Sequence, residues 1–280
     1  MKENESVLET EVAKISCLGP VGTYSYLAAR EIFSKTGTFI MAPTIKKVFD
    51  NVENEMVDFA VVPAENSIAG VVQETIDSLL DYPLNVVGSY IKEIHHCLAA
   101  RVDDVLLIKQ VKSHVQPLSQ CKEWLSANLP EAILASESSS VEAIVSTTDP
   151  EVAFIADETT AKKHGLKILA RNIQDYKDNY TEFYVLSKNE KNNLVKNLKQ
   201  ENTLMIIASR DRLGLLSDVL NVLTRRKLNL VKLHSRKRID KGWDYYFFLE
   251  IESLPSDPNF IKAKKEIEEY CSLVRILGVV

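Results

Sequence analysis

A threonine stands at the start of an apolar strand in the segment DNYTEFYVLS, residues 178–187. Asp178 and Asn179 are typical of a turn, Thr181 follows, and Phe183 begins a run that predicts a strand. A hydroxyl at the mouth of a strand can donate a hydrogen bond or a proton to a departing group. An isolated threonine more commonly just begins a strand, so the segment alone leaves both interpretations open.

The segment GPVGTYS, residues 19–25, joins a predicted strand to a predicted helix. Gly19 and Gly22 permit close approach of a backbone, and Thr23 or Ser25 can cap the helix. The free N–H groups of a helix N-terminus attract anions. The spacing is not GxGxxG, which excludes a dinucleotide site, and a tight loop with a polar cap is an equally good interpretation.

The segment PAENSIAGVVQETIDSLL, residues 63–80, repeats this arrangement. Glu65, Asn66 and Ser67 follow the apolar run FAVV, where the end of a strand in an α/β sheet favours a ligand site. One apolar helical face then follows, made of Val71, Val72, Thr75, Ile76, Leu79 and Leu80. Asn66 or Ser67 can equally serve as the N-cap of that helix.

Two other polar segments have a mainly structural interpretation. SHVQPLSQC, residues 113–121, predicts a helix that starts near Pro117, and Ser139 with Glu142 forms a capping box. The five histidines and four cysteines show no metal-ligand spacing. We therefore expect no metal and no cofactor, and we expect reduced, mostly buried cysteines.

The elements that must position these residues alternate between strands and helices. Apolar runs and helical patterns follow each other up to residue 187, which predicts α/β structure with mainly parallel sheets. Residues 188–202 are rich in Lys, Asn and Glu and indicate a domain boundary. The remaining residues predict β-α-β-β-α-β order, the ferredoxin-like split motif, with a hairpin around IDKG. Within WDYYFFLEIE, one face should cover the helices, namely Tyr245, Phe247, Leu249 and Ile251.

The composition is that of an ordinary globular protein. The chain has 280 residues, 45% hydrophobic and 26% charged, with a net charge of −5. No block of lysine and arginine stands out, so we expect neither a nucleic-acid nor a membrane partner. The start, MKENESVLETEVAK, has no apolar core typical of a signal peptide, and we expect a cytoplasmic location.

Six motifs in order carry a resemblance to a known family. GPVGTYS, PAENSIAG, HHCL, SHVQPLSQC, SSSVEA and NYTEF occur in the order found in prephenate dehydratases, and the tail resembles their ACT regulatory domain. The resemblance implies a two-lobed catalytic domain similar to type 2 periplasmic binding proteins, followed by a ferredoxin-like ACT domain. It places the catalytic domain at 12–188, with lobe one at about 12–90 plus 183–187 and lobe two at about 91–177. A linker at 189–202 and the ACT domain at 203–280 follow.

The resemblance also implies an activity and the residues that perform it. The family converts prephenate to phenylpyruvate in phenylalanine biosynthesis, without a cofactor. Thr181 is the implied donor to the departing hydroxyl, and the implied substrate-binding residues are Thr23, Ser25, Glu65, Asn66, Ser67, Asn179 and Phe183. Glu182 stands where the family usually has Arg, and alternation along a strand can turn it away from Thr181. Lys112 or Arg171 are candidates to replace that cation.

The tail implies feedback control. ACT domains of this family bind phenylalanine at a subunit interface, and the matching residues here are Gly214, Leu215, Asn229, Leu230, Ser235 and Arg236. Leu215, His234 and Lys237 replace the usual Ala, Glu and Pro, so we expect altered affinity or selectivity. A homodimer or homotetramer is expected.

Three alternatives stay open at this point. An arogenate dehydratase performs the same elimination on a substrate with an ammonium group, which Glu182 could favour. A prephenate decarboxylase resembles the catalytic region but typically lacks both the catalytic threonine and the ACT tail. A non-enzymatic amino-acid sensor would keep two lobes and an ACT module, but retention of Thr181 argues against it.

Overall fold

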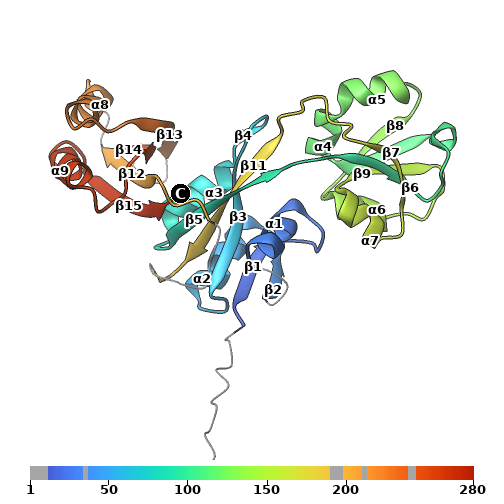
Figure 1. The fold of residues 1–280 in the computed structure, drawn as a ribbon, viewed down its shortest axis with the longest axis horizontal. Coiled ribbons are helices and arrows are strands. Elements are labelled where there is room, and N and C mark those ends of the chain that lie inside the picture. The colour runs from blue at the N-terminus through green and yellow to red at the C-terminus, as the bar shows by residue number, and fades with distance from the viewer. Residues whose placement is uncertain (1–11, 34–36, 190–197, 210–212, 239–243) are drawn as a thin grey trace, which may run out of the picture.

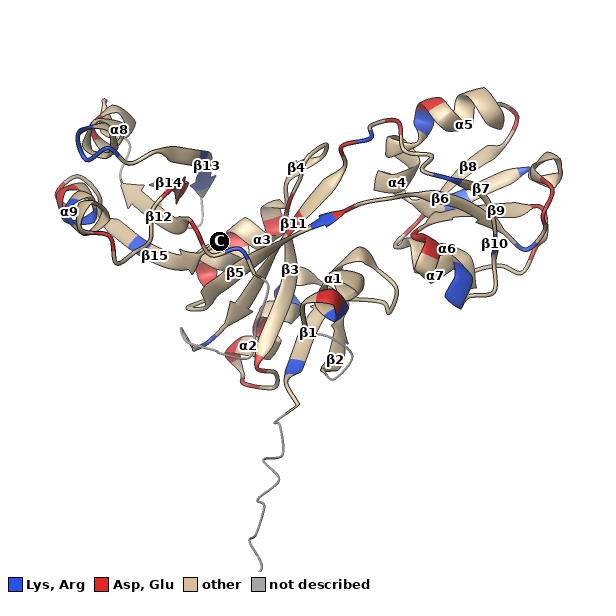
Figure 2. Cartoon of the chain, in the orientation of Figure 1, with Lys and Arg blue, Asp and Glu red and all other residues tan. Residues whose placement is uncertain are grey.

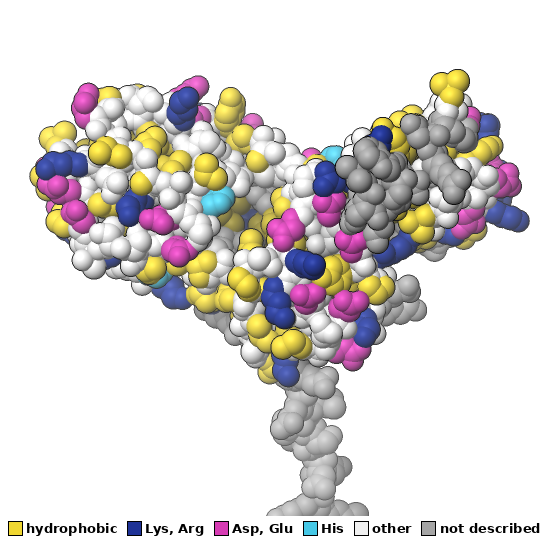
Figure 3. Space-filling model, turned by 180° about the vertical axis from the view of Figure 1, so that it is seen from behind, with side chains coloured by type: hydrophobic (Ala, Val, Ile, Leu, Met, Phe, Trp, Pro, Cys, Tyr) yellow, Lys and Arg dark blue, Asp and Glu magenta, His cyan; other side chains and the backbone are white. Residues whose placement is uncertain are grey.

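The structure is a computed structural model that describes residues 12–33, 37–189, 198–209, 213–238 and 244–280. Figure 1 shows three parts in a row, with lobe one in the centre, lobe two on one side and the C-terminal domain on the other. Basic and acidic residues occur in all three parts (Figure 2), and the face seen from behind carries both signs interspersed (Figure 3). Within the described residues, no helix is both long and apolar enough to cross a membrane.

Lobe one surrounds one end of a ten-stranded sheet, whose order is β13-β14-β12-β15-β5-β11-β3-β1-β2, with β4 paired to β3. Its strands are β1 (Lys14–Leu18), β2 (Thr38–Ala42), β3 (Phe59–Asn66), β4 (Gly70–Val71), β5 (Asn85–Glu93) and β11 (Tyr180–Ser187). Its helices are α1 (Tyr24–Phe33), α2 (Ile45–Glu53) and α3 (Gln73–Asp81). The apolar side chains of α1 pack on one face of the sheet and those of α2 and α3 on the other.

Lobe two has its own five-stranded sheet, in the order β10-β6-β9-β7-β8. Its strands are β6 (Cys97–Ala100), β7 (Gln110–His114), β8 (Ile133–Glu137), β9 (Val152–Ala156) and β10 (Lys167–Arg171). Its helices are α4 (Val115–Gln120), α5 (Lys122–Asn128), α6 (Ser140–Val145) and α7 (Glu158–Lys163), with a short 3₁₀ helix, η2 (Val105–Leu107). Two apolar clusters, one on each face of this sheet, form its core.

The chain crosses between the lobes twice, along the long strands β5 and β11 (Figure 1). These two strands pair antiparallel because one carries the chain out of lobe one and the other brings it back. The prediction of mainly parallel sheets is therefore only partly right. The pairs β1–β2, β1–β3, β7–β8 and β7–β9 are parallel, but β11–β3, β10–β6 and β6–β9 are antiparallel.

The C-terminal domain has the predicted β-α-β-β-α-β order. Its elements are β12 (Thr203–Ser209), α8 (Leu215–Arg225), β13 (Leu230–Arg238), β14 (Asp244–Ile251), α9 (Pro258–Ile267) and β15 (Leu273–Val279). Phe247, Leu249 and Ile251 pack against α8 and α9, with Tyr245 partly buried beside them, which confirms the predicted face of β14. The turn predicted at IDKG lies outside the described residues.

The opposite face of this domain's sheet is also covered. Tyr246 and Phe248 belong to the same apolar cluster as Tyr184 and Leu186 of β11 and several residues of α2 and α3. The alternation in β14 predicted only one buried face. A strand that is buried on both sides is apolar throughout, so period-two alternation does not reveal its second buried face. Lobe one and the C-terminal domain thus share one core.

One glycine makes the join between the two sheets possible. β15 pairs parallel to β5 at Gly278 and Val86. A Cβ built on Gly278 would lie 1.8 Å from Val86 O, and the φ of Gly278 is +139°, so no other residue fits without a backbone shift. The last residues of the predicted linker lie alongside β5. Lys199 forms a bridge with Ser89, and Leu198 packs against Gly88. The rest of that linker lies outside the described residues.

Candidate active site

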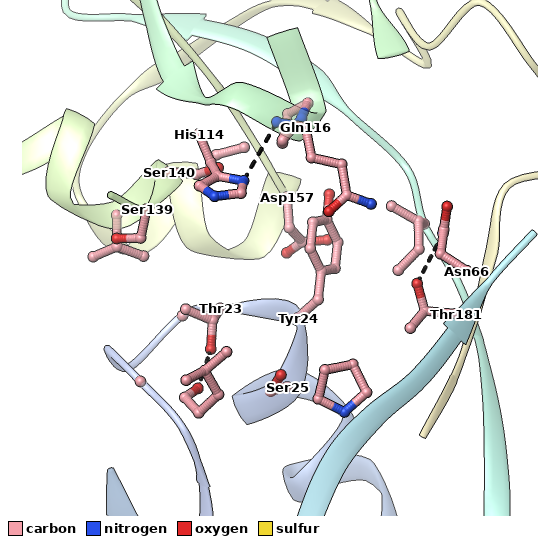
Figure 4. A pocket seen from close by; sticks show the side chains of 18 of the residues that line it. Thr23, Tyr24, Ser25, Asn66, His114, Gln116, Ser139, Ser140, Asp157 and Thr181 are labelled. Atoms are coloured by element: carbon pink, nitrogen blue, oxygen red, sulfur yellow. Dashed lines mark hydrogen bonds between the residues drawn. The ribbon is translucent and has the colours of Figure 1, made fainter. Parts of the chain in front are cut away.

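A cavity of about 320 Å³ lies between the two lobes, and its walls come from both (Figure 4). Five of the residues expected at the substrate site line it, namely Thr23, Ser25, Asn66, Thr181 and Phe183. Thr181 and Phe183 point to the same side of β11, as residues two apart on a strand do. The cavity therefore gathers motifs that are up to 160 residues apart in the chain.

Thr181 and Asn66 form the centre of one wall. They are a cross-strand pair of β11 and β3, and Asn66 Nδ2 donates to Thr181 Oγ1 at 3.0 Å (Figure 4). This bond uses an acceptor site of the hydroxyl and leaves its proton available for a ligand. The same amide nitrogen lies 2.8 Å from Asn179 Oδ1 and 2.8 Å from Tyr180 O, so its two N–H groups are shared among three acceptors.

A chain of buried hydrogen bonds extends from this wall into lobe two. Asn179 Nδ2 donates to Gln120 Oε1 at 3.1 Å, and the same oxygen lies 2.9 Å from His96 Nε2. His96 Nδ1 in turn lies 2.8 Å from the hydroxyl of Tyr24, at the start of α1. Burial lowers the pKa of His96, which keeps its ring neutral, and burial raises the pKa of the Tyr24 hydroxyl. These neutral groups fix the position of Asn66 and Thr181 relative to both lobes.

Several helices begin at the cavity. His114, Ser139 and Asp157 are the N-caps of α4, α6 and α7, and Thr23 Oγ1 accepts from Tyr26 N at the start of α1. Figure 4 shows the side chains of all four residues around one space. Because helix N-termini present N–H groups and positive dipole ends, the ends at Thr23, His114 and Ser139 favour anions, whereas the Asp157 carboxylate opposes them. Thr160 of α7 also donates to Gly22 O at 2.7 Å, which joins the GPVG loop to lobe two.

The helix after PAENS does not begin where the sequence predicted. α3 starts at Gln73, and its N-cap is Val72, so neither Asn66 nor Ser67 caps it. Asn66 Oδ1 instead accepts from Ile68 N and Ala69 N, which turns the chain into the short hairpin of β3 and β4. The predicted capping of this helix by Asn66 or Ser67 was therefore wrong, although its actual N-cap, Val72, does line the cavity.

Three predicted substrate-site residues lie outside the cavity lining. Asn179 is buried behind Asn66 in the hydrogen-bond chain. Ser67 Oγ donates to Asp178 O and accepts from Tyr180 N, which anchors the start of β11. Glu65 lies on the opposite side of β3 and forms an ion pair with Lys232.

The cations considered as replacements for the missing arginine are also elsewhere. Lys112 pairs with Glu137, and Arg171 makes two hydrogen bonds to Glu158. Glu182, which occupies the arginine's position, points away from the cavity to Lys232 at 2.6 Å. Among the described lining residues, none is a lysine or an arginine, and Asp157 is the single carboxylate.

A second cavity of about 270 Å³ lies at the start of α8, in the C-terminal domain. Gly214, Leu215 and Ser235, three of the expected effector residues, line it together with Leu216, Ser217, Tyr245 and Phe247. The other three do not. Asn229 donates to Glu252, Leu230 packs into the core beneath the helices, and Arg236 makes a two-bond ion pair with Asp77 of α3.

The sequence did not single out several residues that line the active-site cavity. His114, Gln116 and Ser139 lie within motifs that were interpreted as structural, and His114 and Ser139 do cap helices. Tyr24, His96 and Gln120 stand inside quoted motifs, and no local pattern indicated their roles, since His96 and Gln120 are buried and their partners lie far away in the sequence. Asp157 follows the strand VAFIA, a position at the end of a strand that could have indicated it.

Comparison with known proteins agrees with this arrangement. The family model described as prephenate dehydratase matches residues 15–191, and the ACT domain model matches residues 203–269. The prephenate dehydratase of Bacillus subtilis is 33% identical over 277 residues, covering 95% of this chain and 97% of the relative. The bifunctional chorismate mutase/prephenate dehydratase of Aquifex aeolicus is 34% identical over 266 residues, covering 95% of this chain and 72% of the relative.

A solved structure has the same fold. The prephenate dehydratase of Arthrobacter aurescens in complex with L-Phe superposes with a TM-score of 0.84 at 24% identity, covering 95% of this chain and 89% of that one. The relatives do not favour the arogenate alternative, and Glu182, the residue that suggested it, does not line the cavity. The family model covers more than half of the chain, and this chain belongs to the prephenate dehydratase family, with an ACT domain at its C-terminal end.

Proposed function

We propose that this protein converts prephenate to phenylpyruvate in the cavity between its lobes, with Thr181 assisting departure of the ring hydroxyl. The observation that carries the proposal is the Thr181–Asn66 pair. Its hydrogen bond occupies an acceptor site of the threonine oxygen and leaves the proton free to face the cavity. Loss of the ring carboxylate as carbon dioxide supplies the electron pair that makes the ring aromatic. The hydroxyl leaves as water and takes one proton.

The cavity suits a dianionic substrate without a cation in its walls. The helix N-termini at Thr23, His114 and Ser139 offer N–H donors to the two carboxylates, and the Ser139 hydroxyl can add another donor. The Thr23 hydroxyl is not available, because it donates to Leu18 O at 2.8 Å. Phe183, Pro63 and Val72 offer apolar contact to the ring. A threonine hydroxyl is a very weak acid, so Thr181 acts by a hydrogen bond or a concerted transfer, not by prior ionisation.

Regulation by phenylalanine at the second cavity is part of the same proposal. The Arthrobacter aurescens relative was solved in complex with L-Phe, and three residues implied by the resemblance to bind the effector, Gly214, Leu215 and Ser235, line the second cavity here. β13 lies at the edge of the ten-stranded sheet, with Val231 and Leu233 exposed on it, which suits pairing with a second copy. A homodimer or homotetramer in the cytoplasm completes the proposal.

The experiment follows phenylpyruvate formation by absorbance with purified wild-type protein, Thr181→Val and Thr181→Ser. Wild type should turn over prephenate, and Thr181→Val should lose at least about 10²-fold in kcat. Thr181→Ser keeps the hydroxyl and should retain more activity than Thr181→Val. Arogenate serves as the second substrate.

No turnover of prephenate by wild type would overturn the proposed activity, and preferred turnover of arogenate would reassign the substrate. Near wild-type kcat in Thr181→Val would overturn the role of Thr181. Thermal unfolding of each variant shows whether a loss of activity reflects a loss of fold.

A further inference from the structure

A single lysine of the ACT domain contacts both strands that carry the active-site pair. Lys232 Nζ of β13 lies 3.0 Å from Glu65 Oε2 of β3 and 2.6 Å from Glu182 Oε2 of β11. The buried Glu250 of β14 is a third neighbour, at 3.4 Å. The Glu182 side chain is 11% exposed and that of Glu250 3% exposed, so water screens these charges weakly.

The two carboxylates stand directly behind the active-site pair. Glu65 and Glu182 face each other across β3 and β11, and the next pair along the ladder is Asn66 and Thr181. Like charges directly opposite each other on neighbouring strands repel. Without Lys232, repulsion at Glu65 and Glu182 would push the strands apart one residue away from the 3.0 Å contact between Asn66 Nδ2 and Thr181 Oγ1.

The rest of the β3–β11 ladder cannot easily absorb this repulsion. The register shifts between Glu182 and Phe183, because β3 has an extra residue there. The pairs Thr181–Asn66 and Glu182–Glu65 are therefore separated from the regular part of the ladder, and they are the two pairs at its end. β5 and Ser67 hold the other edge and the start of β11, so the contact between Thr181 and Asn66 is the part that depends on the charges at the neighbouring Glu65–Glu182 pair.

We propose that Lys232 is a positioning residue for the dehydration, which neutralises Glu65 and Glu182 and so keeps Thr181 and Asn66 in register. The inference rests on the proposed role of Thr181. It assigns a purpose to Glu182, the residue that departs from the family's usual arginine, since Glu182 provides a second carboxylate for Lys232. It also makes the ACT domain a structural part of the active site, because Lys232 belongs to that domain. Lys232 lies on the same strand, β13, as Ser235, which lines the second cavity.

The test compares kcat and KM for prephenate in wild type, Lys232→Gln and the double variant Lys232→Gln/Glu182→Gln. Lys232→Gln should lower kcat at least tenfold and change KM less than threefold, because the cavity walls stay and only Thr181 moves. The double variant removes the repulsion together with the lysine and should recover kcat to within threefold of wild type. Lys264→Gln, which removes a lysine paired with Glu268 on α9, is the matched control and should behave as wild type.

The rescue distinguishes positioning from simple domain docking. If Lys232 only attached the ACT domain, the double variant would lack that attachment too and would be no more active than Lys232→Gln. That result, or a Lys232→Gln kcat within twofold of wild type, would overturn the proposal.

Two further variants keep the test decisive. Glu182→Asp keeps the charge but shortens the reach to Lys232, and it replaces Lys232→Gln if that variant does not fold. It should lower kcat about threefold or more at unchanged KM, and an unchanged kcat would overturn the proposal. Thr181→Val belongs in the same series, because its retention of activity would instead overturn the proposed role of Thr181, on which this inference rests.

Discussion

The active-site cavity relies on neutral donors, and its central residue is an amide. Asn66 donates to Thr181 through Nδ2 and turns the backbone through Oδ1, which accepts from Ile68 N and Ala69 N. The identity of each atom in this side chain therefore matters. An amide and a carboxylate have the same shape, but the exchange replaces the N–H donor by an acceptor and adds a negative charge at a buried position.

Asn66→Asp should lower kcat by at least about tenfold, a moderate value for a misdirected catalytic hydrogen bond. The carboxylate would accept the hydroxyl proton of Thr181 and divert it from the substrate. Steady-state kinetics with prephenate measure the effect. Asn128→Asp, an exposed amide of α5 whose Nδ2 donates to Trp124 O, is the control and should leave kcat unchanged. Equal kcat in Asn66→Asp and wild type would contradict this account of Thr181.

At the scale of single residues, the sequence predicted those lining residues of the cavity that lie within a recognisable motif. Thr23, Ser25, Asn66, Thr181 and Phe183 line the cavity, and all but Phe183 stand at a strand end or a helix start. Glu65 and Ser67 belong to the same loop but face elsewhere, because neighbouring residues of a strand point to opposite sides. β3 has a bulge at this point, so the side to which each side chain points cannot be obtained by counting residues along the sequence.

The crossing segments position the site by buried hydrogen bonds between lobes. His96, directly before β6, is 1% exposed and contacts Gln120 and Tyr24. Burial lowers the pKa of His96 below its ordinary value of 6.5, although Asp157 opposes the shift. Burial lowers the pKa of His114 as well.

Acid should destabilise the protein through these histidines. As pH falls below about 6.5, the unfolded chain takes up protons that the folded chain does not, so the free energy of unfolding decreases with falling pH. The decrease continues until the lowered folded-state pKa is passed. Thermal unfolding between pH 7.5 and 5 should show a smaller loss of Tm in His96→Gln than in wild type. His164→Gln, at the end of α7, should keep the wild-type slope, and an unchanged slope in His96→Gln would refute the assignment.

A second element-scale prediction concerns the join between β15 and β5. Gly278→Ala places a Cβ 1.8 Å from Val86 O, so the backbone must move apart. We expect a loss of about 2–3 kcal/mol in the free energy of unfolding, in the range of overpacked cores. Gly165→Ala is the matched control, because its φ is +73° but nothing lies within 4 Å of the added Cβ. Urea unfolding of both variants should show the larger loss in Gly278→Ala, and equal losses would contradict a steric role for Gly278.

The elements themselves were largely predictable, since each has its own period and turn residues. The order of elements in the C-terminal domain and the capping of α6 by Ser139 both follow from local pattern. The sheet directions and the second buried face of β14 do not, because they depend on segments that meet only after the chain has crossed between lobes. A local period reports burial on one side and says nothing about a partner that arrives from elsewhere.

At the scale of the whole molecule, phenylalanine should stabilise the protein through the cavity at α8. A ligand present at 100 times its Kd stabilises by about 2.7 kcal/mol, which should raise Tm and shift the protein towards a larger species in sedimentation. Ser235→Phe places a ring in the cavity of about 270 Å³ and should abolish both effects while leaving kcat unchanged. A full response in Ser235→Phe would place the effector elsewhere, and no response of wild type to millimolar phenylalanine would exclude the regulation.

The shared sheet has a consequence for the modularity of the protein. ACT domains are often thought of as detachable sensors, but here lobe one and the C-terminal domain, on either side of the expected linker at 189–202, share one sheet and one apolar cluster. Cutting the chain there and removing the C-terminal part would expose Tyr184 and would leave β5 with an open edge at Val86. The isolated fragment would carry a strand whose unpaired edge can pair with other chains, and an exposed apolar face. An ACT domain could be exchanged between enzymes of this kind only together with the residues of β5 and β11 that it contacts.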